Sequence, residues 1–218
     1  MFFLDRKDAG EKLGLALMKY KNQDTVILGI PRGGTVVAAE VARSLEAPLD
    51  VIIPRKMGAP HNPEVAIGAV TQDGTIIKDE TMVQLLGVSE EQIRVLAEKV
   101  SGEISRRVNA YRRGRLGLNL EGKTVIVVDD GIATGFTVQA ALKSIRNVNP
   151  CRLILAVPVL PADTVQLLQE KVDELVYLQA PELFYAVGQF YIEFDQTSDN
   201  EVIELLAGHE KNEVTGKG

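Results

Sequence analysis

Residues 125–137, with the sequence VIVVDDGIATGFT, constrain the fold of this chain more than any other segment. The four β-branched apolar residues at its start are typical of a buried strand. Two adjacent carboxylates follow, and a short loop of small and hydroxyl-bearing residues then leads into a helix-compatible run over 138–147. The segment therefore predicts a strand–loop–helix unit with an acidic pair at the carboxyl end of the strand.

The loop of this unit has the chemistry of a sugar-phosphate site. The free N–H groups of a helix N-terminus and the hydroxyls of Thr134 and Thr137 can together bind a phosphate. Asp129 and Asp130 can accept hydrogen bonds from the vicinal hydroxyls of a ribose. Neither G-x-G-x-x-G nor a Gly-Lys-Ser/Thr run is present here, which excludes a dinucleotide fingerprint and a Walker loop. The alternative is an ordinary buried strand that ends in a polar turn.

Strand-like and helical patterns alternate along the rest of the chain. Strands are expected over 25–30, 49–53, 125–128, 153–157 and 175–177, a hairpin over 65–77, and helices over 5–20, 33–45, 89–113, 138–147, from about 161, and over 201–206. Ser89 and Gln92 form a capping-box pattern at the start of the long helix. This order predicts an α/β fold with a mainly parallel sheet and helices on both faces. Such sheets bind ligands beyond the carboxyl ends of their strands.

A second candidate element, GIPRGGT at residues 29–35, directly follows the first predicted strand. Gly33 and Gly34 allow the backbone to approach an anion closely, and the next helix points its N-terminus at the same place. Two glycines before a helix are also typical of a plain turn. Because this loop and the acidic pair follow parallel strands, we expect both to lie at the same edge of the sheet.

Residues 125–137 resemble, at every position, the signature of the type I phosphoribosyltransferases, which has four apolar residues, two acids, small residues and Thr-Gly-x-Thr. The resemblance implies that Asp129 and Asp130 bind the 2- and 3-hydroxyls of phosphoribosyl pyrophosphate (PRPP). It also implies a loop that binds the 5-phosphate, formed by Ile132, Ala133, Thr134, Gly135, Phe136 and Thr137. Arg32, Gly33 and Gly34 would then form the pyrophosphate loop, with a cis peptide at Pro31–Arg32.

The resemblance extends over residues 3–206, which are similar to a bacterial and archaeal group of predicted phosphoribosyltransferases. The shared patterns are an N-terminal Asp-Arg…Ala-Gly, the Pro-Arg-Gly-Gly loop and a Gln-Thr-Ser-Asp run near the C-terminus. This similarity implies the fold and PRPP binding, but no particular acceptor.

Arg55 and Lys56 are expected at the end of the second strand, where the family often places basic residues for pyrophosphate. An exposed polar strand end is the alternative. The Gly- and Pro-containing segment 57–63 follows, and we expect it to be a mobile lid that excludes water from the reacting centre. Within it, His61 could contact pyrophosphate or carry a proton, although an exposed loop histidine is equally typical.

An aromatic-x-Val-Gly pattern near the C-terminus resembles the base-binding hood of the purine phosphoribosyltransferases. The resemblance places Tyr185 at the position that stacks on the base, with Phe184 beside it, in an acceptor pocket. The family's acid is displaced, because Ile192 occupies its position and Glu193 follows. Aromatic residues at this spacing are also typical of a simple core.

The implied activity is a Mg²⁺-dependent transfer of the 5-phosphoribosyl group of PRPP to an unidentified acceptor, with release of pyrophosphate, and a nucleobase is the expected acceptor. Asp129, Asp130, Arg55 and Lys56 would be the catalytic residues. Asp129 and Asp130 would contact the metal only by way of the bound PRPP. One alternative is a regulatory protein that senses PRPP or a nucleotide on the same fold without turning it over. Another is a hydrolase or other ribose-phosphate enzyme on the same scaffold.

The composition of the 218-residue chain bounds the remaining expectations. A net charge of −6 argues against nucleic-acid binding, so small molecules are the expected ligands. The single Cys151 excludes an internal disulfide and suits a reducing compartment, and its apolar neighbours predict a buried thiol. With no signal peptide or membrane span recognised, a cytoplasmic location and no membrane partner are expected, and a homo-oligomer is the expected assembly.

We expect a single phosphoribosyltransferase-like domain over residues 1–210. It would contain a helical insertion at about 79–115 and a hood at about 179–200, and a disordered tail would follow over 211–218.

Overall fold

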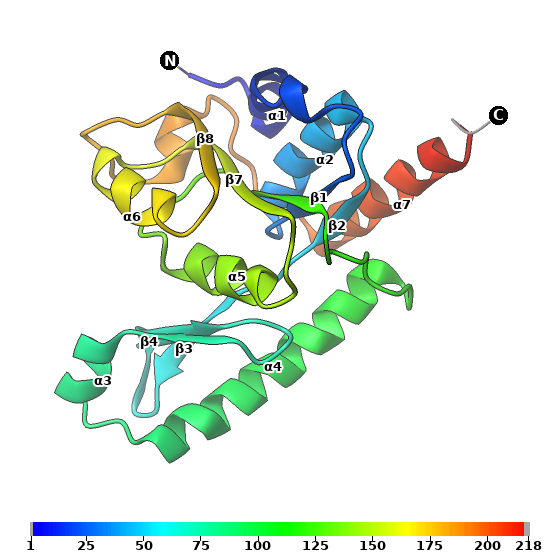
Figure 1. Cartoon of the computed structure of the whole chain (residues 1–218). Coiled ribbons are helices and arrows are strands. Elements are labelled where there is room, and N and C mark those ends of the chain that lie inside the picture. The colour runs from blue at the N-terminus through cyan, green and yellow to red at the C-terminus, as the bar shows by residue number, and fades with distance from the viewer. Residues whose placement is uncertain (1, 216–218) are drawn as a thin grey trace.

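The computed structural model describes residues 2–215 and divides them between a five-stranded parallel sheet with helices on both faces and a smaller antiparallel sheet with a long helix (Figure 1). In sheet order, the five parallel strands are β2 (Leu49–Val51), β1 (Thr25–Gly29), β6 (Thr124–Val128), β7 (Arg152–Val159) and β8 (Glu174–Gln179). The predicted α/β architecture is confirmed.

The alternation of side chains along β6 explains why both faces of this sheet are covered. Val125 and Val127 pack with α5 (Phe136–Arg146) and α6 (Val165–Gln169) on one face. Ile126 and Val128 point to the other face and pack against α1 (Arg6–Ala16) and α2 (Gly33–Leu45). Because all four side chains are buried, β6 reads as a continuous apolar run, as expected of a central parallel strand.

The register of the central strands brings the two candidate loops together. Gly29, the last residue of β1, pairs with Val128, the last residue of β6. The chain therefore leaves both strands at the same edge, into the glycine loop on one side and into the acidic pair on the other.

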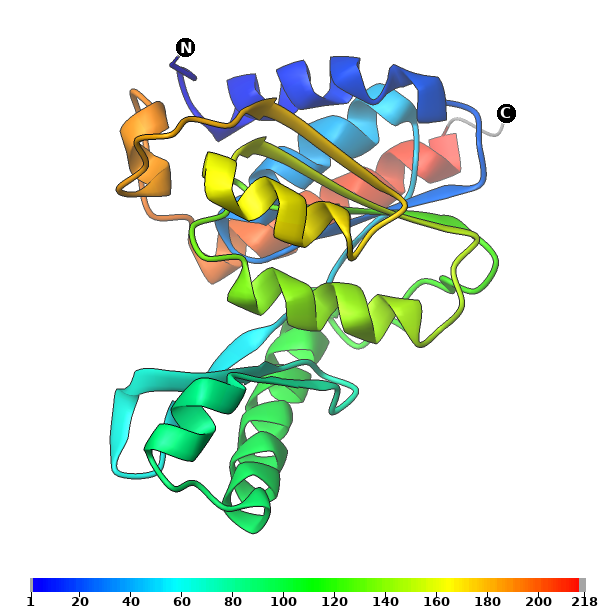
Figure 2. The same ribbon diagram turned by 60° about the vertical axis from the view of Figure 1, so that its left-hand side comes forward.

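The smaller part is inserted between β2 and β6. It consists of β3 (Arg55–Ala59), β4 (Asn62–Val70), β5 (Ile76–Lys78), α3 (Glu80–Leu85) and α4 (Glu90–Arg112). Apolar residues of α4, among them Ile93, Ile104 and Val108, pack on Met57 and Ile67 of the small sheet. The structure therefore groups the helices predicted at 79–115 with the preceding hairpin as one unit. In both views α5 lies between this unit and the five-stranded sheet (Figures 1 and 2).

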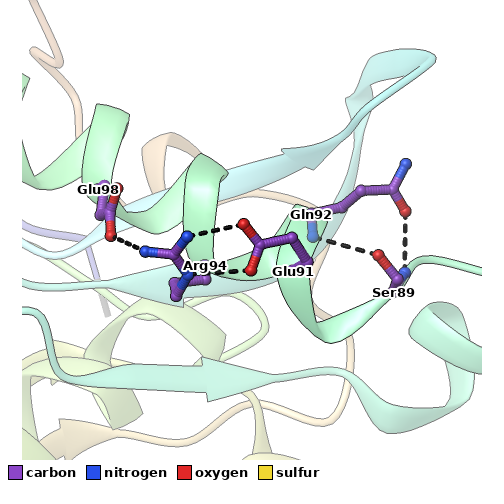
Figure 3. Close-up of polar contacts among 5 residues, drawn as sticks. All are labelled: Ser89, Glu91, Gln92, Arg94 and Glu98. Carbon is purple, nitrogen blue, oxygen red and sulfur yellow. Dashed lines mark hydrogen bonds and ion pairs between the residues drawn. The ribbon is translucent and has the colours of Figure 1, made fainter.

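The start of α4 is fixed by the predicted capping box (Figure 3). The Ser89 hydroxyl accepts a hydrogen bond from the Gln92 amide at 3.2 Å, and the Gln92 side chain accepts one from the Ser89 amide at 2.9 Å. One turn later, Arg94 forms ion pairs with Glu91 and Glu98. The capping contacts satisfy amides that the first turn of a helix would otherwise leave unpaired.

Two expectations about the segment after β2 differ from the structure. Arg55 and Lys56 lie at the start of β3 rather than at the end of β2, because the chain turns away after Val51 to begin the antiparallel sheet. Most of segment 57–63 is also strand, with the β3–β4 turn at Pro60 and His61, so it is not an irregular loop.

The observed ends of two helices also differ from the predicted ones. The predicted helix 5–20 ends as α1 at Ala16, and a 3₁₀ turn, η1 (Met18–Tyr20), follows; two further 3₁₀ turns are η2 (Ala162–Thr164) and η3 (Val187–Phe190). The last helix, α7 (Asp199–Thr215), is longer than the predicted 201–206. Of the predicted tail over 211–218, residues 216–218 lie outside the described part. No helix within 2–215 is long and apolar enough to cross a membrane.

Candidate functional site

The glycine loop and the acidic pair are in direct contact at the carboxyl edge of the sheet. A methyl group added at Gly33 would lie 2.0 Å from the Asp130 Oδ2 atom, and one added at Gly34 would lie 2.6 Å from the Asp129 Oδ1 atom. Only glycine therefore allows the start of α2 to pack this closely against the two carboxylates. The peptide bond between Pro31 and Arg32 is cis, as the resemblance implied.

The two carboxylates occupy different environments. The Asp129 carboxyl lies against Gly34 at the start of α2 and accepts a hydrogen bond from the Asp130 amide at 2.8 Å. Burial, and then the negative charge of Asp130, raise the pKa of Asp129 well above its usual range. The Asp130 carboxylate instead has a cationic partner, the Arg6 guanidinium, whose Nε lies 2.7 Å from Oδ2. The pair thus combines one carboxyl that resists ionisation with one that is held in an ion pair.

Arg6, from the first turn of α1, connects the acidic pair to the C-terminal part of the chain. Its guanidinium also donates to the Asp195 carbonyl at 2.6 Å and lies 3.8 Å from the centre of the Phe194 ring. The hydroxyl of Tyr191, which stacks on Phe194, donates to the Asp130 carbonyl. These three side chains come from segments more than 60 residues away from the acidic pair, so the site is closed by distant parts of the chain.

Sequence reasoning did not assign a site role to Arg6 or Tyr191. The only signal for Arg6 was its place in the Asp-Arg…Ala-Gly pattern shared with the resembling group. Tyr191 stood among five aromatic residues, and nothing in their spacing distinguished it from its neighbours.

The predicted phosphate loop lies between β6 and α5. Gly135 has a φ of +70°, a left-handed conformation that favours glycine, and it turns the chain directly into the helix. The side chain of Thr134 is exposed and that of Thr137 is partly exposed. Because the first amides of α5 have no partner within the helix, they can donate to a bound anion. The Ile132 amide is already used, since it donates to the Val159 carbonyl at 3.0 Å.

The predicted basic and lid residues lie on the small sheet. Arg55 forms an ion pair with Glu103 of α4 at 2.7 Å, while Lys56 is exposed. His61 is exposed in the β3–β4 turn, where it lines a small cavity of about 140 Å³ with residues such as Leu86 and Gln92. The structure thus places these residues on the inserted unit and not in contact with the acidic pair.

The predicted hood follows β8 and packs against the loop after the acidic pair. Val187 contacts Gly131, because a methyl group added at Gly131 would lie 2.5 Å from Val187. Phe184 packs on Phe190, with ring centres 5.2 Å apart. Tyr185 is 86% exposed, so its ring is open to solvent beside this contact.

Cys151 is exposed, contrary to the expectation of a buried thiol. It precedes β7, which begins at Arg152, and its amide donates to the Lys123 carbonyl at 2.9 Å. The apolar run that follows it is the buried strand, whereas Cys151 itself belongs to the connecting loop.

The acidic pair fits a metal ion that arrives with a phosphorylated ligand. Within the described part of the chain, no group of three or more His, Cys, Asp or Glu side chains is arranged to hold a metal. Mg²⁺ is often held by only one or two carboxylates when substrate phosphates supply further oxygen ligands. Asp129 and Asp130 lie beside the phosphate loop, where they would meet such an ion by way of the bound ligand.

Comparison with known proteins identifies relatives along almost the whole chain. Two Mycobacterium tuberculosis proteins, from strains CDC 1551 / Oshkosh and H37Rv, are each named "Putative phosphoribosyl transferase" and are 43% identical over 204 residues. The match covers 94% of this chain but 46% of each relative, so the chain spans about half their length. The crystal structure of TT1426 from Thermus thermophilus superposes with a TM-score of 0.82 at 38% identity, over 95% of this chain and 99% of that one.

A family model described as the phosphoribosyl transferase domain matches residues 7–195. The match includes the glycine loop, the inserted unit, the acidic pair and the hood as far as residue 195. This chain therefore belongs to the phosphoribosyl transferase domain family.

Proposed function

We propose that the chain catalyses transfer of the 5-phosphoribosyl group of PRPP to an acceptor, a nucleobase, with release of pyrophosphate. One observation carries this proposal: the glycine loop packs directly against two adjacent carboxylates, and the phosphate loop opens beside them at the start of α5. A ligand held there would meet hydroxyl-binding oxygens and two groups of phosphate-binding amides. PRPP carries all three of the matching groups.

The acidic pair would fix the ribose ring. Asp129 and Asp130 would accept hydrogen bonds from the 2- and 3-hydroxyls, and the Arg6 ion pair would hold the Asp130 carboxylate in position. The first amides of α5, with Thr134 and Thr137, would bind the 5-phosphate. With the ring held at both ends, the C1 atom has little freedom to move, which favours reaction by positioning.

The reaction at C1 exchanges one bond for another. A lone pair on an acceptor nitrogen forms the new bond to C1, while the bond from C1 to the pyrophosphate oxygen breaks and its electrons leave with pyrophosphate. The proton of the acceptor nitrogen passes to water. The amides of Gly33 and Gly34 and the Arg32 guanidinium would bind the leaving group. Mg²⁺ that arrives with PRPP beside Asp129 and Asp130 would further neutralise the negative charge of the leaving pyrophosphate.

The remaining assigned residues lie on parts that flank this centre. Tyr185 and Phe184 would form a wall of the acceptor pocket, next to the loop at Gly131. Arg55, Lys56 and His61 would reach pyrophosphate when the β3–β4 hairpin closes over the bound ligand.

Calorimetry with Mg-PRPP tests the binding part of the proposal. The Asp129→Asn/Asp130→Asn double variant should bind at least tenfold more weakly than wild type, because a hydrogen bond to a charged group contributes ~1.5–3 kcal/mol. Asp163→Asn, which changes one exposed carboxylate outside the site, is the control. Equal affinity for the double variant and wild type would contradict the assignment of the acidic pair.

Pyrophosphate release in the presence of a panel of nucleobases tests the catalytic part. A second candidate, a sensor that binds PRPP without turnover, is favoured by the engagement of Arg55 with Glu103 instead of the acidic pair. Turnover with any acceptor supports the transferase. Tight Mg-PRPP binding without pyrophosphate release for every acceptor class would support the sensor.

A further inference from the structure

A second cavity, which we name the α4 groove, lies between α4, β3 and the start of α7 and has a volume of about 440 Å³. Four α4 residues at the spacing i, i+3, i+4 and i+7 form one stripe along the helix and line the groove: Glu103, Arg106, Arg107 and Ala110. The lining is completed by Arg55, Tyr111, Asp199 and Ile203. This volume falls within the range of small-molecule sites.

The charges in the α4 groove are unequally satisfied. Of its two acids, Glu103 pairs with Arg55 at 2.7 Å, and Asp199 accepts a hydrogen bond from the Tyr111 hydroxyl. Arg106 and Arg107 are exposed, and neither forms an ion pair or hydrogen bond within the described part of the chain. The groove therefore offers two adjacent arginine side chains with which no described carboxylate forms an ion pair.

Tyr111, which lines the groove, is buried. Burial, and then the hydrogen bond to Asp199, raise the pKa of the Tyr111 hydroxyl, whereas the positive charges of Arg107 and Arg32 oppose this rise. Arg32 is the N-cap residue of α2 and belongs to the glycine loop. The groove is formed by residues of α4, β3 and α7, whereas the hood contacts the acidic pair through Tyr191.

We propose that the α4 groove binds a small phosphate-bearing oxyanion, with Arg106 and Arg107 as the binding residues. The planar guanidinium group presents paired N–H donors that match the oxygens of a phosphate and keeps its charge at every physiological pH. The size of the groove and the net charge of −6 favour a small anion over a nucleic-acid chain. This site is separate from the ribose site at the acidic pair and goes beyond the proposed transfer reaction.

Calorimetry with inorganic pyrophosphate, in the absence of Mg²⁺ and PRPP, tests the proposal. The Arg106→Gln/Arg107→Gln variant should bind pyrophosphate at least tenfold more weakly than the wild type. The matched control is Arg94→Gln/Lys99→Gln, which removes the same charge from the same helix at positions that do not line the groove. Affinity in the control should stay within twofold of wild type. Equal losses in both double variants would overturn the proposal, because they would reflect net charge alone.

Hydrogen exchange locates the bound anion. Pyrophosphate should protect amides over residues 103–111, and this protection should persist in Asp129→Asn/Asp130→Asn, whose ribose site is disabled. Protection confined to 29–34 would overturn the proposal. Because this exchange experiment contains no PRPP, it can contradict the anion site in the α4 groove while PRPP binding at the acidic pair is still observed. It can equally support the anion site when PRPP binding is absent.

Two further ligands identify the source of the phosphate. Inorganic phosphate and a nucleoside monophosphate are titrated into wild type and into Arg106→Gln/Arg107→Gln. A nucleotide that binds more tightly than pyrophosphate, and loses at least tenfold in the variant, identifies an organic phosphate ester as the ligand. A preference for pyrophosphate with the same loss identifies the inorganic anion. If no ligand is weakened by the double substitution, Arg106 and Arg107 do not form an anion site.

Discussion

The surroundings of Asp129 disfavour the ionised carboxylate that its proposed role in ribose binding uses. Burial and the neighbouring Asp130 raise its pKa, so the folded state favours the protonated form more than the unfolded chain does. A raised pKa contributes stability that is fully present below the unfolded pKa of about 3.9 and is lost as the pH rises through the folded value. At neutral pH the ionised carboxylate therefore lowers the free energy of unfolding.

We predict that Asp129→Asn raises the free energy of unfolding at pH 8 by about 1 kcal/mol or more, since one pKa unit corresponds to ~1.4 kcal/mol. The amide oxygen of Asn can still accept the hydrogen bond from Asp130. The gain should shrink as the pH falls towards 4, because the wild-type carboxyl then becomes protonated. Urea unfolding at several pH values measures this difference, with Asp163→Asn as a control for net charge. A gain that does not depend on pH would contradict the assigned cause.

Tyr185 provides a second prediction for a single residue. Its ring is 86% exposed, so Tyr185→Ala should leave the free energy of unfolding nearly unchanged. If the ring stacks on an acceptor base, its loss should raise the KM for the acceptor by about 5- to 100-fold, since stacking contributes ~1–3 kcal/mol. PRPP affinity should be unaffected. Steady-state kinetics and calorimetry measure the two quantities, and an unchanged KM would remove Tyr185 from the acceptor pocket.

At the scale of elements, the start of α2 packs against the acidic pair so closely that a side chain at Gly33 would clash with it. A methyl group at Gly33 would lie 2.0 Å from Asp130 Oδ2 and 2.6 Å from Arg6 Nε. We predict that Gly33→Ala forces the Arg6–Asp130 ion pair apart and weakens Mg-PRPP binding at least tenfold.

Gly102→Ala is the matched control for this prediction. Gly102 is exposed on α4 with open space around it, so alanine there should raise the free energy of unfolding by about 0.5–1 kcal/mol without changing ligand affinity. Calorimetry on both variants makes the comparison. Retained PRPP affinity in Gly33→Ala would show that the close packing is dispensable for the site.

The elements that bear local signals could be predicted from the sequence. Helix α2 follows from its apolar periodicity, and the start of α4 from the capping box at Ser89. The acidic pair and the glycine loop could be placed at one edge because both follow parallel strands. Arg6 could not be placed there, since its approach to Asp130 depends on how α1 packs across the sheet, which no local pattern encodes.

The packing of the inserted unit, like the position of Arg6, could not be predicted from local sequence patterns. The hairpin and the long helix were each predicted, but their union was not, because it rests on contacts such as those between Met57 and Ile104. The prediction that Arg55 ends the second strand was wrong for a related reason. The chain after Val51 has apolar residues that extend the strand pattern, although the parallel pairing itself ends there.

For the molecule as a whole, we predict that the inserted unit responds to the ligand. Hydrogen exchange over residues 57–63 should slow when Mg-PRPP binds, because the hairpin would close towards the glycine loop. Amides of β7, an interior strand of the five-stranded sheet, are the internal reference. If the hairpin shows no added protection while calorimetry confirms binding, this unit is not a lid.

The way in which α4 is attached determines how far each part of the inserted unit would move. The C-terminal end of α4 is anchored where Arg112 contacts Asp50 at 2.9 Å. Its N-terminal end, at Glu90, lies 22 residues away beside the β3–β4 turn, where Gln92 and His61 line one cavity. At 1.5 Å per residue the helix is a lever of about 34 Å, so a rotation of about 10° at the anchor moves the far end by about 6 Å. Arg107 lies only about five residues from the fulcrum and moves by about 1 Å in the same rotation. One stiff rod can therefore swing the hairpin widely while the arginines at its base stay almost in place.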